Sequence, residues 1–416
     1  MTTADGAASP PAAGGAAQRS GAARPPARPG LRAGPVVVVS IAVASFSTIL
    51  SQSAFSPFLP LISESLGISV ALLGQAPAAS MLLAGVLGLA AGPLADRFGQ
   101  RRALLVGLVA LAASAVGIGL SQNYLMFMVV MLVSAIGRAT ILPVSMVVGG
   151  TRFVGEAQRR ALSWMSTGLV AATILGVPFL TSIGEYLGWR GAFLTLALIA
   201  LGAAVLCWRG LGPDVGLSDA PFHLRDLATP YGPILRHRPT VLFLLASLIG
   251  NIGLWNIQTY QGAFWVEEHQ LSLHQIGLAA LVQGCGGLVG SWLMSTRVGA
   301  ISPRRLLVIN RFGTGILIAL PFVVPVPTLV AVACFALGYV MGGMGTIAST
   351  LALSDAPTGR ATVLTLNGAA WSVGISLGAA TGGLALTLGG FELLGVCAFA
   401  SMAVASGLLR LSERPV

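Results

Sequence analysis

Long apolar segments recur along the whole chain and are the feature that most constrains its fold. About twelve of them reach the roughly 20 residues that a helix needs to cross a bilayer. They lie at roughly 36–62, 70–92, 103–121, 124–149, 161–184, 190–209, 240–266, 273–295, 305–324, 327–352, 361–387 and 391–410. We therefore predict an all-α polytopic membrane protein whose helices form two pseudo-symmetric six-helix bundles.

The composition favours lipid over water as the surrounding medium. Only 9% of the 416 residues are charged, against roughly 25% in a soluble domain. The net charge of +10 would suit nucleic acid, but all 23 basic residues are arginines that lie in short clusters between apolar segments. That pattern is typical of membrane topology, so we expect a lipid partner and no nucleic acid. Without lysine the chain also lacks the Walker A residue of an ATP-driven pump.

Polar segments divide the chain into four regions. Residues 1–34 are rich in Ala, Gly, Pro and Arg, and we expect them to form a disordered cytoplasmic tail. Regions 35–210 and 239–412 correspond to the two helix bundles. Residues 211–238 form the longest internal polar stretch and are interpreted as a cytoplasmic linker with a short amphipathic helix.

In this twelve-span scheme nearly all the arginines fall on one side of the membrane. The opposite side carries Arg190 and most of the glutamates, including Glu64, Glu185 and Glu267. Because arginine-rich loops stay in the cytoplasm, we expect a multi-pass protein of the inner or plasma membrane with both termini cytoplasmic.

The most charged short segment between predicted helices runs from Gly92 to Arg102 and is expected to form a tight cytoplasmic loop. It resembles the G-x-L-x-D-R-x-G-R-R loop between helices two and three of the major facilitator superfamily. The matching functional positions are Gly92, Asp96, Arg97, Gly99 and Arg101, with Arg102 directly after them and Gln100 in place of a basic residue. The resemblance implies the two-bundle fold and a secondary transporter.

The same resemblance implies a gate. In the family the loop carboxylate, here Asp96, faces the start of helix eleven and a base near the cytoplasmic end of helix four. Arg152 is the residue that could supply this base, and together they would latch the outward-open state. The equivalent position after the eighth span is Met294, so the latch is not duplicated. The alternative is that Arg97, Arg101 and Arg102 only mark topology.

Arg138 lies about halfway along the fourth predicted span, where a guanidinium is costly unless it faces a polar cavity. Its context, Ile136-Gly137-Arg138, resembles the helix-four arginine motif that is linked to proton coupling in drug/proton antiporters. We interpret Arg138 as a substrate anchor or a coupling charge. Backbone carbonyls and helix packing could instead satisfy it.

Gly176 and Pro178 in the fifth span resemble part of the helix-five antiporter signature G-x-x-x-G-P-x-x-G. Ala172 stands where the signature has its first glycine, and Pro178 is shifted by one residue. The match implies efflux, although a proline kink alone would account for Pro178.

Polar side chains form stripes on helices that, by the resemblance, line a central cavity. The predicted substrate-binding residues are Gln52 on the first span, Asn251, Trp255 and Gln258 on the seventh, Tyr339 and Thr346 on the tenth, and Asn367 on the eleventh. Amides facing lipid would be costly, so they must face protein or water. Hydrogen bonding between helices is the alternative.

These residues together predict a monomeric secondary active transporter that works by alternating access and needs no cofactor or metal. We expect efflux of a small organic molecule and leave proton antiport open, because the spans lack a central carboxylate. One alternative is uptake or exchange of an organic anion anchored by Arg138. A membrane-embedded enzyme or receptor is disfavoured, because His223, His237, His269 and His274 lack metal-ligand spacing.

Overall fold

The computed structural model describes residues 34–214, 234, 236–297, 301–323, 327–354 and 360–412. Within its helices, a few side chains are not described, among them those of Gly92, Asp96 and Thr346. The predicted N-terminal tail and the predicted amphipathic helix of the linker lie outside the described residues.

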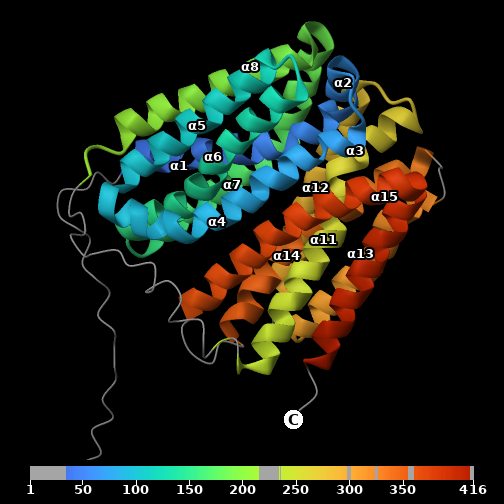
Figure 1. The fold of residues 1–416 in the computed structure, drawn as a ribbon. Coiled ribbons are helices and arrows are strands. Elements are labelled where there is room, and N and C mark those ends of the chain that lie inside the picture. The colour runs from blue at the N-terminus through green and yellow to red at the C-terminus, as the bar shows by residue number, and fades with distance from the viewer. Residues whose placement is uncertain are drawn as a thin grey trace, which may run out of the picture.

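The first half of the chain forms an α-helical bundle (Figure 1). Its elements are α1 (Pro35–Ser53), α2 (Phe55–Leu66), α3 (Val70–Leu73), α4 (Gln75–Phe98), α5 (Gln100–Leu120), α6 (Tyr124–Arg152), α7 (Glu156–Ala171), the π-helical turn η1 (Ala172–Gly176) and α8 (Val177–Gly210). Gly188 interrupts α8 with a φ of 70°. The chain reverses there, so the helix contains the end of the fifth predicted span and the whole of the sixth.

The second half repeats this arrangement with fewer breaks. It comprises α11 (Arg238–Glu267), α12 (Leu273–Arg297), α13 (Pro303–Val323), α14 (Pro327–Ser354) and α15 (Arg360–Leu411). Non-helical backbone at Gly389 and Gly390 divides α15 between the eleventh and twelfth predicted spans. Within the described ranges, nine helices are long and apolar enough to cross a membrane, and α14 contributes the shorter apolar stretch Leu329–Met344. With the continuous helical segment Glu156–Gly210 and α15 each counted as two passes, the helices fit the predicted scheme.

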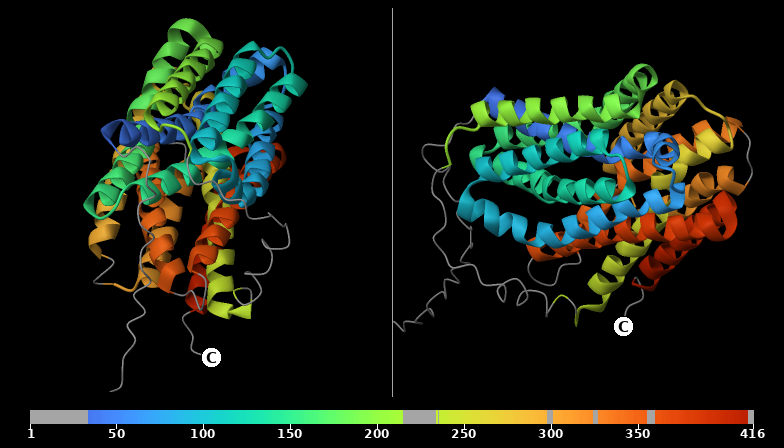
Figure 2. Two further views of the ribbon diagram at one scale, coloured as in Figure 1. Left: turned by 90° about the vertical axis from the view of Figure 1, so that its left-hand side faces the viewer. Right: turned by 45° about the horizontal axis from the view of Figure 1, so that its top comes forward.

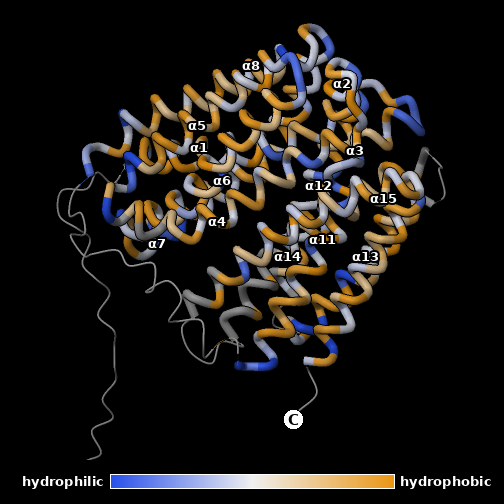
Figure 3. The backbone as a smooth tube through the Cα atoms, viewed as in Figure 1, coloured by the Kyte–Doolittle hydropathy of each residue, from blue (hydrophilic) through white to orange (hydrophobic). Residues whose placement is uncertain are grey.

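Apolar residues cover most of both bundles, and hydrophilic residues concentrate at their ends (Figure 3). We call the end that carries Glu64, Glu267 and Glu268 the glutamate end. The opposite end, with Arg101 and Arg152, is called the arginine end. The long apolar helices run between these two ends, as expected for the predicted membrane-spanning helices.

The two halves meet at the glutamate end and diverge toward the arginine end (Figures 1 and 2). The Tyr260 hydroxyl of α11 donates to the Ala379 carbonyl at 2.8 Å and lies 3.5 Å from the Ala71 carbonyl of the other half. Gln75 Nε2 donates across the interface to the Ala380 carbonyl at 3.3 Å. A Cβ added to Gly262 would lie 2.0 Å from the Ser56 carbonyl oxygen, so α11 and the start of α2 are in backbone contact there.

The structure corrects the prediction of a tight loop from Gly92 to Arg102. Helix α4 continues through Phe98 and α5 begins at Gln100, so Gly99 alone separates them. Gly99 has a φ of 102°, which favours glycine. Hydropathy ends near Gly92, but Leu94, Ala95 and Arg97 are good helix formers, and the helix therefore extends past the apolar segment.

Candidate functional site

A cavity of about 280 Å³ lies between the two halves. The first half contributes Gln52 and Ser53 from α1 and Thr173 from η1, and the second contributes residues of α11, α12, α14 and α15. Ser291 and Met344 extend the cavity toward the arginine end, away from the closed contacts at the glutamate end. Its walls therefore belong to both bundles, as a site that changes with their relative position requires.

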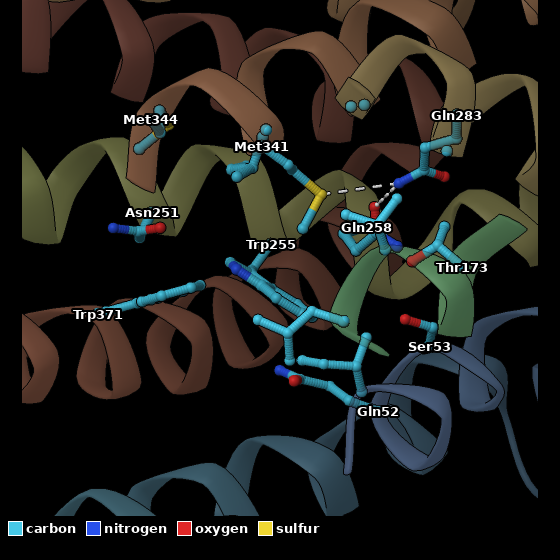
Figure 4. Close-up of a pocket in the computed structure, with 18 of the residues that line it drawn as sticks. Gln52, Ser53, Thr173, Asn251, Trp255, Gln258, Gln283, Met341, Met344 and Trp371 are labelled. Atoms are coloured by element: carbon cyan, nitrogen blue, oxygen red, sulfur yellow. Dashed lines mark hydrogen bonds between the residues drawn. The ribbon is translucent and has the colours of Figure 1, made fainter. Parts of the chain in front are cut away.

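The apolar part of the wall is aromatic and sulfur-containing (Figure 4). Trp255 on α11 is 7% exposed, and Trp371 on α15 is 46% exposed. Met341 and Met344 of α14 complete this surface. Methionine and tryptophan adapt to flat apolar ligands, so this wall suits the body of an organic molecule.

An ordered chain of amides crosses the cavity wall between α11 and α12. Gln261 Nε2 donates to Gln283 Oε1 at 3.4 Å, and Gln283 Nε2 donates to Gln258 Oε1 at 2.9 Å. Gln283 Nε2 also lies 3.7 Å from the Met341 sulfur, as Figure 4 shows. Because the carbonyl of Gln258 accepts within the wall, its amide nitrogen is the atom left to face a ligand.

A second polar group lies nearer the arginine end of the cavity. Asn251 Nδ2 donates to the Ser247 carbonyl at 2.7 Å, and Ser247 Oγ donates to Asn367 Oδ1 at 2.8 Å. All three residues line the cavity while bonding to each other. The bond between Ser247 and Asn367 joins α11 to α15. These residues therefore line the cavity and also bond the two helices together.

Arg138 lines a smaller cavity of about 20 Å³ next to the main one. Gln52, Trp255 and Gln258 line both cavities. The other lining residues of the small cavity, such as Ser56 and Ala379, belong to the closed contacts, so Arg138 lies at the glutamate-end side of the main cavity. Among the described residues lining either cavity, Arg138 alone carries a charge.

The fifth span contributes to the cavity through a π-helical turn. Residues Ala172–Gly176 form η1 directly before Pro178, whose ring cannot continue the α-helical hydrogen-bond pattern. Thr173 in this turn lines the cavity, and a Cβ on Gly284 of α12 would lie 2.2 Å from Ile174. The irregular turn thus lies where the two halves touch beside the cavity.

The basic residues of the predicted gate bind the end of α8 within their own half. Arg101 Nη2 donates to the Trp208 carbonyl at 2.6 Å, and its guanidinium lies 5.8 Å from the Trp208 ring centroid. Arg152 is 4% exposed and donates to the Leu211 carbonyl. Asp214 accepts from the backbone N–H groups of Arg101 at 2.9 Å and Arg102 at 3.2 Å, and therefore caps α5.

Several predicted residues lie apart from these groups. Tyr339, on α14, packs against the main hydrophobic core and is not one of the residues that line the two cavities. Arg97 is exposed at the arginine end, 5.8 Å from the Phe98 ring centroid. The side chains of Asp96 and Thr346 lie outside the description, so the Asp96 latch stays a prediction.

Sequence reasoning missed Gln283, Met341 and Asp214. Gln283 lies on the eighth span, which the family resemblance does not place at the cavity, although its amide within an apolar segment was an available signal. Asp214 belongs to the start of the linker, and nothing local indicates that it caps a helix more than one hundred residues earlier.

Comparison with known proteins gives a matching family and several relatives. The family model of the Major Facilitator Superfamily matches residues 41–379. The chloramphenicol resistance protein of Streptomyces lividans is 27% identical over 372 residues, covering 85% of this chain and 89% of that protein. An MFS-type transporter of Bacillus subtilis, YceJ, is 25% identical over 337 residues, covering 79% and 83%.

Solved structures share the fold. A D-xylose–proton symporter superimposes with a TM-score of 0.71 at 15% identity, covering 89% of this chain and 96% of that one. The nucleoside transporter NupG gives 0.74 at 10% identity, covering 91% and 100%. Because the family model covers residues 41–379, the chain belongs to the major facilitator superfamily of multi-pass membrane transporters and is not an enzyme.

Proposed function

We propose that this protein exports a small organic molecule from the cytoplasm by alternating access. The observation that supports this most directly is the cavity between the two halves, closed at the glutamate end and extended toward the arginine end. With the arginine end in the cytoplasm, as positive-inside topology predicts, the conformation is inward-facing. Rocking of the halves would expose the same cavity to the other side.

The direction of transport rests on two supports. The helix-five segment around Gly176 and Pro178 resembles the antiporter signature, and one relative is named a chloramphenicol resistance protein. The tryptophan and methionine wall suits the apolar body of such an organic molecule. Uptake or exchange would use the same cavity and differ only in which side binds first.

Coupling to protons is the least supported part of the proposal. Of the described carboxylates, none is buried in the membrane interior. An arginine keeps its proton in proteins, so Arg138 supplies a fixed charge rather than a proton carrier. If protons drive export, a carboxylate at the glutamate end such as Glu267 is the candidate group.

Transport in inside-out vesicles tests this function. Labelled candidate compounds should accumulate in vesicles with the protein and not in vesicles without it, and proton antiport requires that collapsing the pH gradient abolishes accumulation. Unchanged accumulation after collapse would exclude proton coupling.

A cross-link tests the alternating mechanism separately. Gln75→Cys with Ala380→Cys places two thiols across the closed contact, where a short bis-maleimide that reacts with both thiols should hold the halves together and stop transport. Each single variant, treated with the same reagent, is the control. Full transport by the cross-linked protein would refute alternating access at this interface.

A further inference from the structure

We infer that the junction of the two cavities is a binding subsite for an anionic group, such as a carboxylate, on the transported molecule. The inference rests on the proposed transport function and adds a substrate class to it. The subsite consists of Arg138 from the first half and of Trp255 and Gln258 from the second.

Two buried donors lie at this junction. Nε of Arg138 and Nε1 of Trp255 are both buried, and no described group accepts a hydrogen bond from either of them. Trp255 is 7% exposed and lines both cavities. Buried donors of this kind normally have an acceptor, because an unsatisfied one costs free energy.

Gln258 adds a third donor through the amide chain. Since its carbonyl accepts from Gln283, and Gln283 in turn accepts from Gln261, the orientation of all three amides is set by one network. The network leaves Gln258 Nε2 as the end of the chain. A group with two acceptor oxygens matches such a set of donors better than an ammonium group, which offers only donors.

The positive charge of Arg138 also favours an anionic ligand. A guanidinium within the membrane is costly unless a polar or anionic partner compensates it. Arg311 differs, because that side chain is 1% exposed, donates through one nitrogen to the Ala246 carbonyl against Gly250 of α11 and lines neither cavity, although its Nε and Nη2 have no described acceptor. Arg138 has no comparable bond among the described residues and instead lines a cavity.

The size of the site limits the ligand. About 20 Å³ beside Arg138 accommodates a group of one or two oxygen atoms rather than a ring. The main cavity of about 280 Å³, with its tryptophan and methionine wall, accommodates the rest of the molecule. The ligand expected is therefore an aromatic or alicyclic monocarboxylate with its charge toward the glutamate end.

The position of the subsite has a mechanistic consequence. Its donors come from opposite halves, and it lies on the side of the cavity where the halves are held together by the contacts of the glutamate end. An anion that bonds to Arg138 and to Trp255 together stabilises the conformation in which the glutamate end is closed. Protein cross-linked there through Gln75→Cys and Ala380→Cys should therefore bind the anion at least as tightly as the uncross-linked protein.

Binding to purified protein in detergent tests the inference, with 1-naphthoate, 1-naphthamide and 1-naphthylmethylamine as a matched set. We expect naphthoate to bind more tightly than the amide or the amine. Arg138→Gln should weaken naphthoate binding roughly ten- to a hundredfold, the range for charge-assisted hydrogen bonds, and leave amide binding unchanged. Trp255→Phe, which keeps an aromatic ring but removes the N–H, should weaken naphthoate binding several-fold.

Arg311→Gln is the control, since it removes another buried guanidinium that lies away from both cavities and should leave the preference for naphthoate intact. If Arg138→Gln fails to fold, Arg138→Lys and Trp255→Phe make the same measurement. Equal binding of the three compounds, or a preference that survives every subsite variant, would overturn the inference even if transport is found. Arg138-dependent naphthoate binding without transport would support the subsite and count against the proposed function.

Discussion

Replacing Asp214 with alanine should destabilise the arginine end of the first half. The carboxylate accepts from the backbone N–H groups of Arg101 and Arg102, which have no partner within α5 because they belong to its first turn. Gly99 permits this approach, since a Cβ at that position would lie 2.1 Å from Asp214 Oδ2. The variant therefore removes a helix cap and a negative charge placed beside Arg152 and Arg101.

The magnitude follows from these contacts. Loss of an N-terminal cap costs about 1 kcal/mol, within a range of roughly 0.5–2 kcal/mol. A negative charge near a helix N-terminus adds about 0.3–1 kcal/mol, and we take the lower end because Asp214 is partly exposed to screening solvent. Asp214→Ala should thus cost about 1–2 kcal/mol and lower the melting temperature by a few degrees. Asp214→Asn, which keeps one acceptor, should cost less.

Labelling of Cys207 with a thiol-reactive fluorophore during a thermal ramp measures this effect. Cys207 is fully buried near the end of α8, next to the Trp208 carbonyl that holds Arg101. The exposed Cys285 is first replaced by serine so that it does not dominate the signal. Glu185→Ala, at an exposed acid of the opposite end, is the control. If Asp214→Ala melts and labels like the unmodified protein, the cap contributes nothing and the reasoning fails.

Three further changes test the gate and the helix contacts. Asp96→Asn should slow transport in vesicles without lowering the amount of protein in the membrane, and an unchanged rate would exclude the latch. Gly262→Val should force α11 away from the Ser56 carbonyl and open the glutamate end. A cysteine introduced there as Gln75→Cys should then react faster with a thiol reagent, and an unchanged rate would refute close contact at this end. Gly338→Ala should lower the melting temperature, because its Cβ would lie 1.7 Å from a backbone carbonyl of α12, whereas Gly313→Ala, with nothing within 4 Å, should keep or raise it.

Apolar segment length predicted the helices well, because the requirement to cross a bilayer is local to each segment. The predicted breaks near Gly188 and Gly390 correspond to positive φ angles of 70° and 65°. The extent of the helix after Gly92 was not predictable from hydropathy, since that signal ends where the helix leaves the apolar region. Helix propensity and capping, rather than the need to cross lipid, determine the last turns of α4.

The cavity was only partly predictable. Gln52, Asn251, Trp255 and Gln258 were identified on polar stripes and Asn367 as a separate candidate on the eleventh span, and each lines the cavity. A stripe gives the face of one helix, but it does not show which polar neighbour the side chain bonds to on another. The amide chain through Gln283 and the cap by Asp214 depend on packing between distant segments, and no local pattern in the sequence encodes them.

The buried arginines show why contacts, rather than burial, separate structural from functional charges in this protein. Arg152 and Arg311 are the most buried, and each donates to a backbone carbonyl of a neighbouring segment. Arg138 is less buried but lacks such a carbonyl and lines a cavity with donors from the opposite half. Arg152 and Arg311 each keep two nitrogens without a described acceptor, but neither lines the two cavities, so a ligand there cannot reach them. A guanidinium with a free donor in a small cavity can instead gain charge-assisted bonds to a ligand. Selectivity should therefore depend on Arg138, although Arg152 and Arg311 contribute more to the stability of the fold.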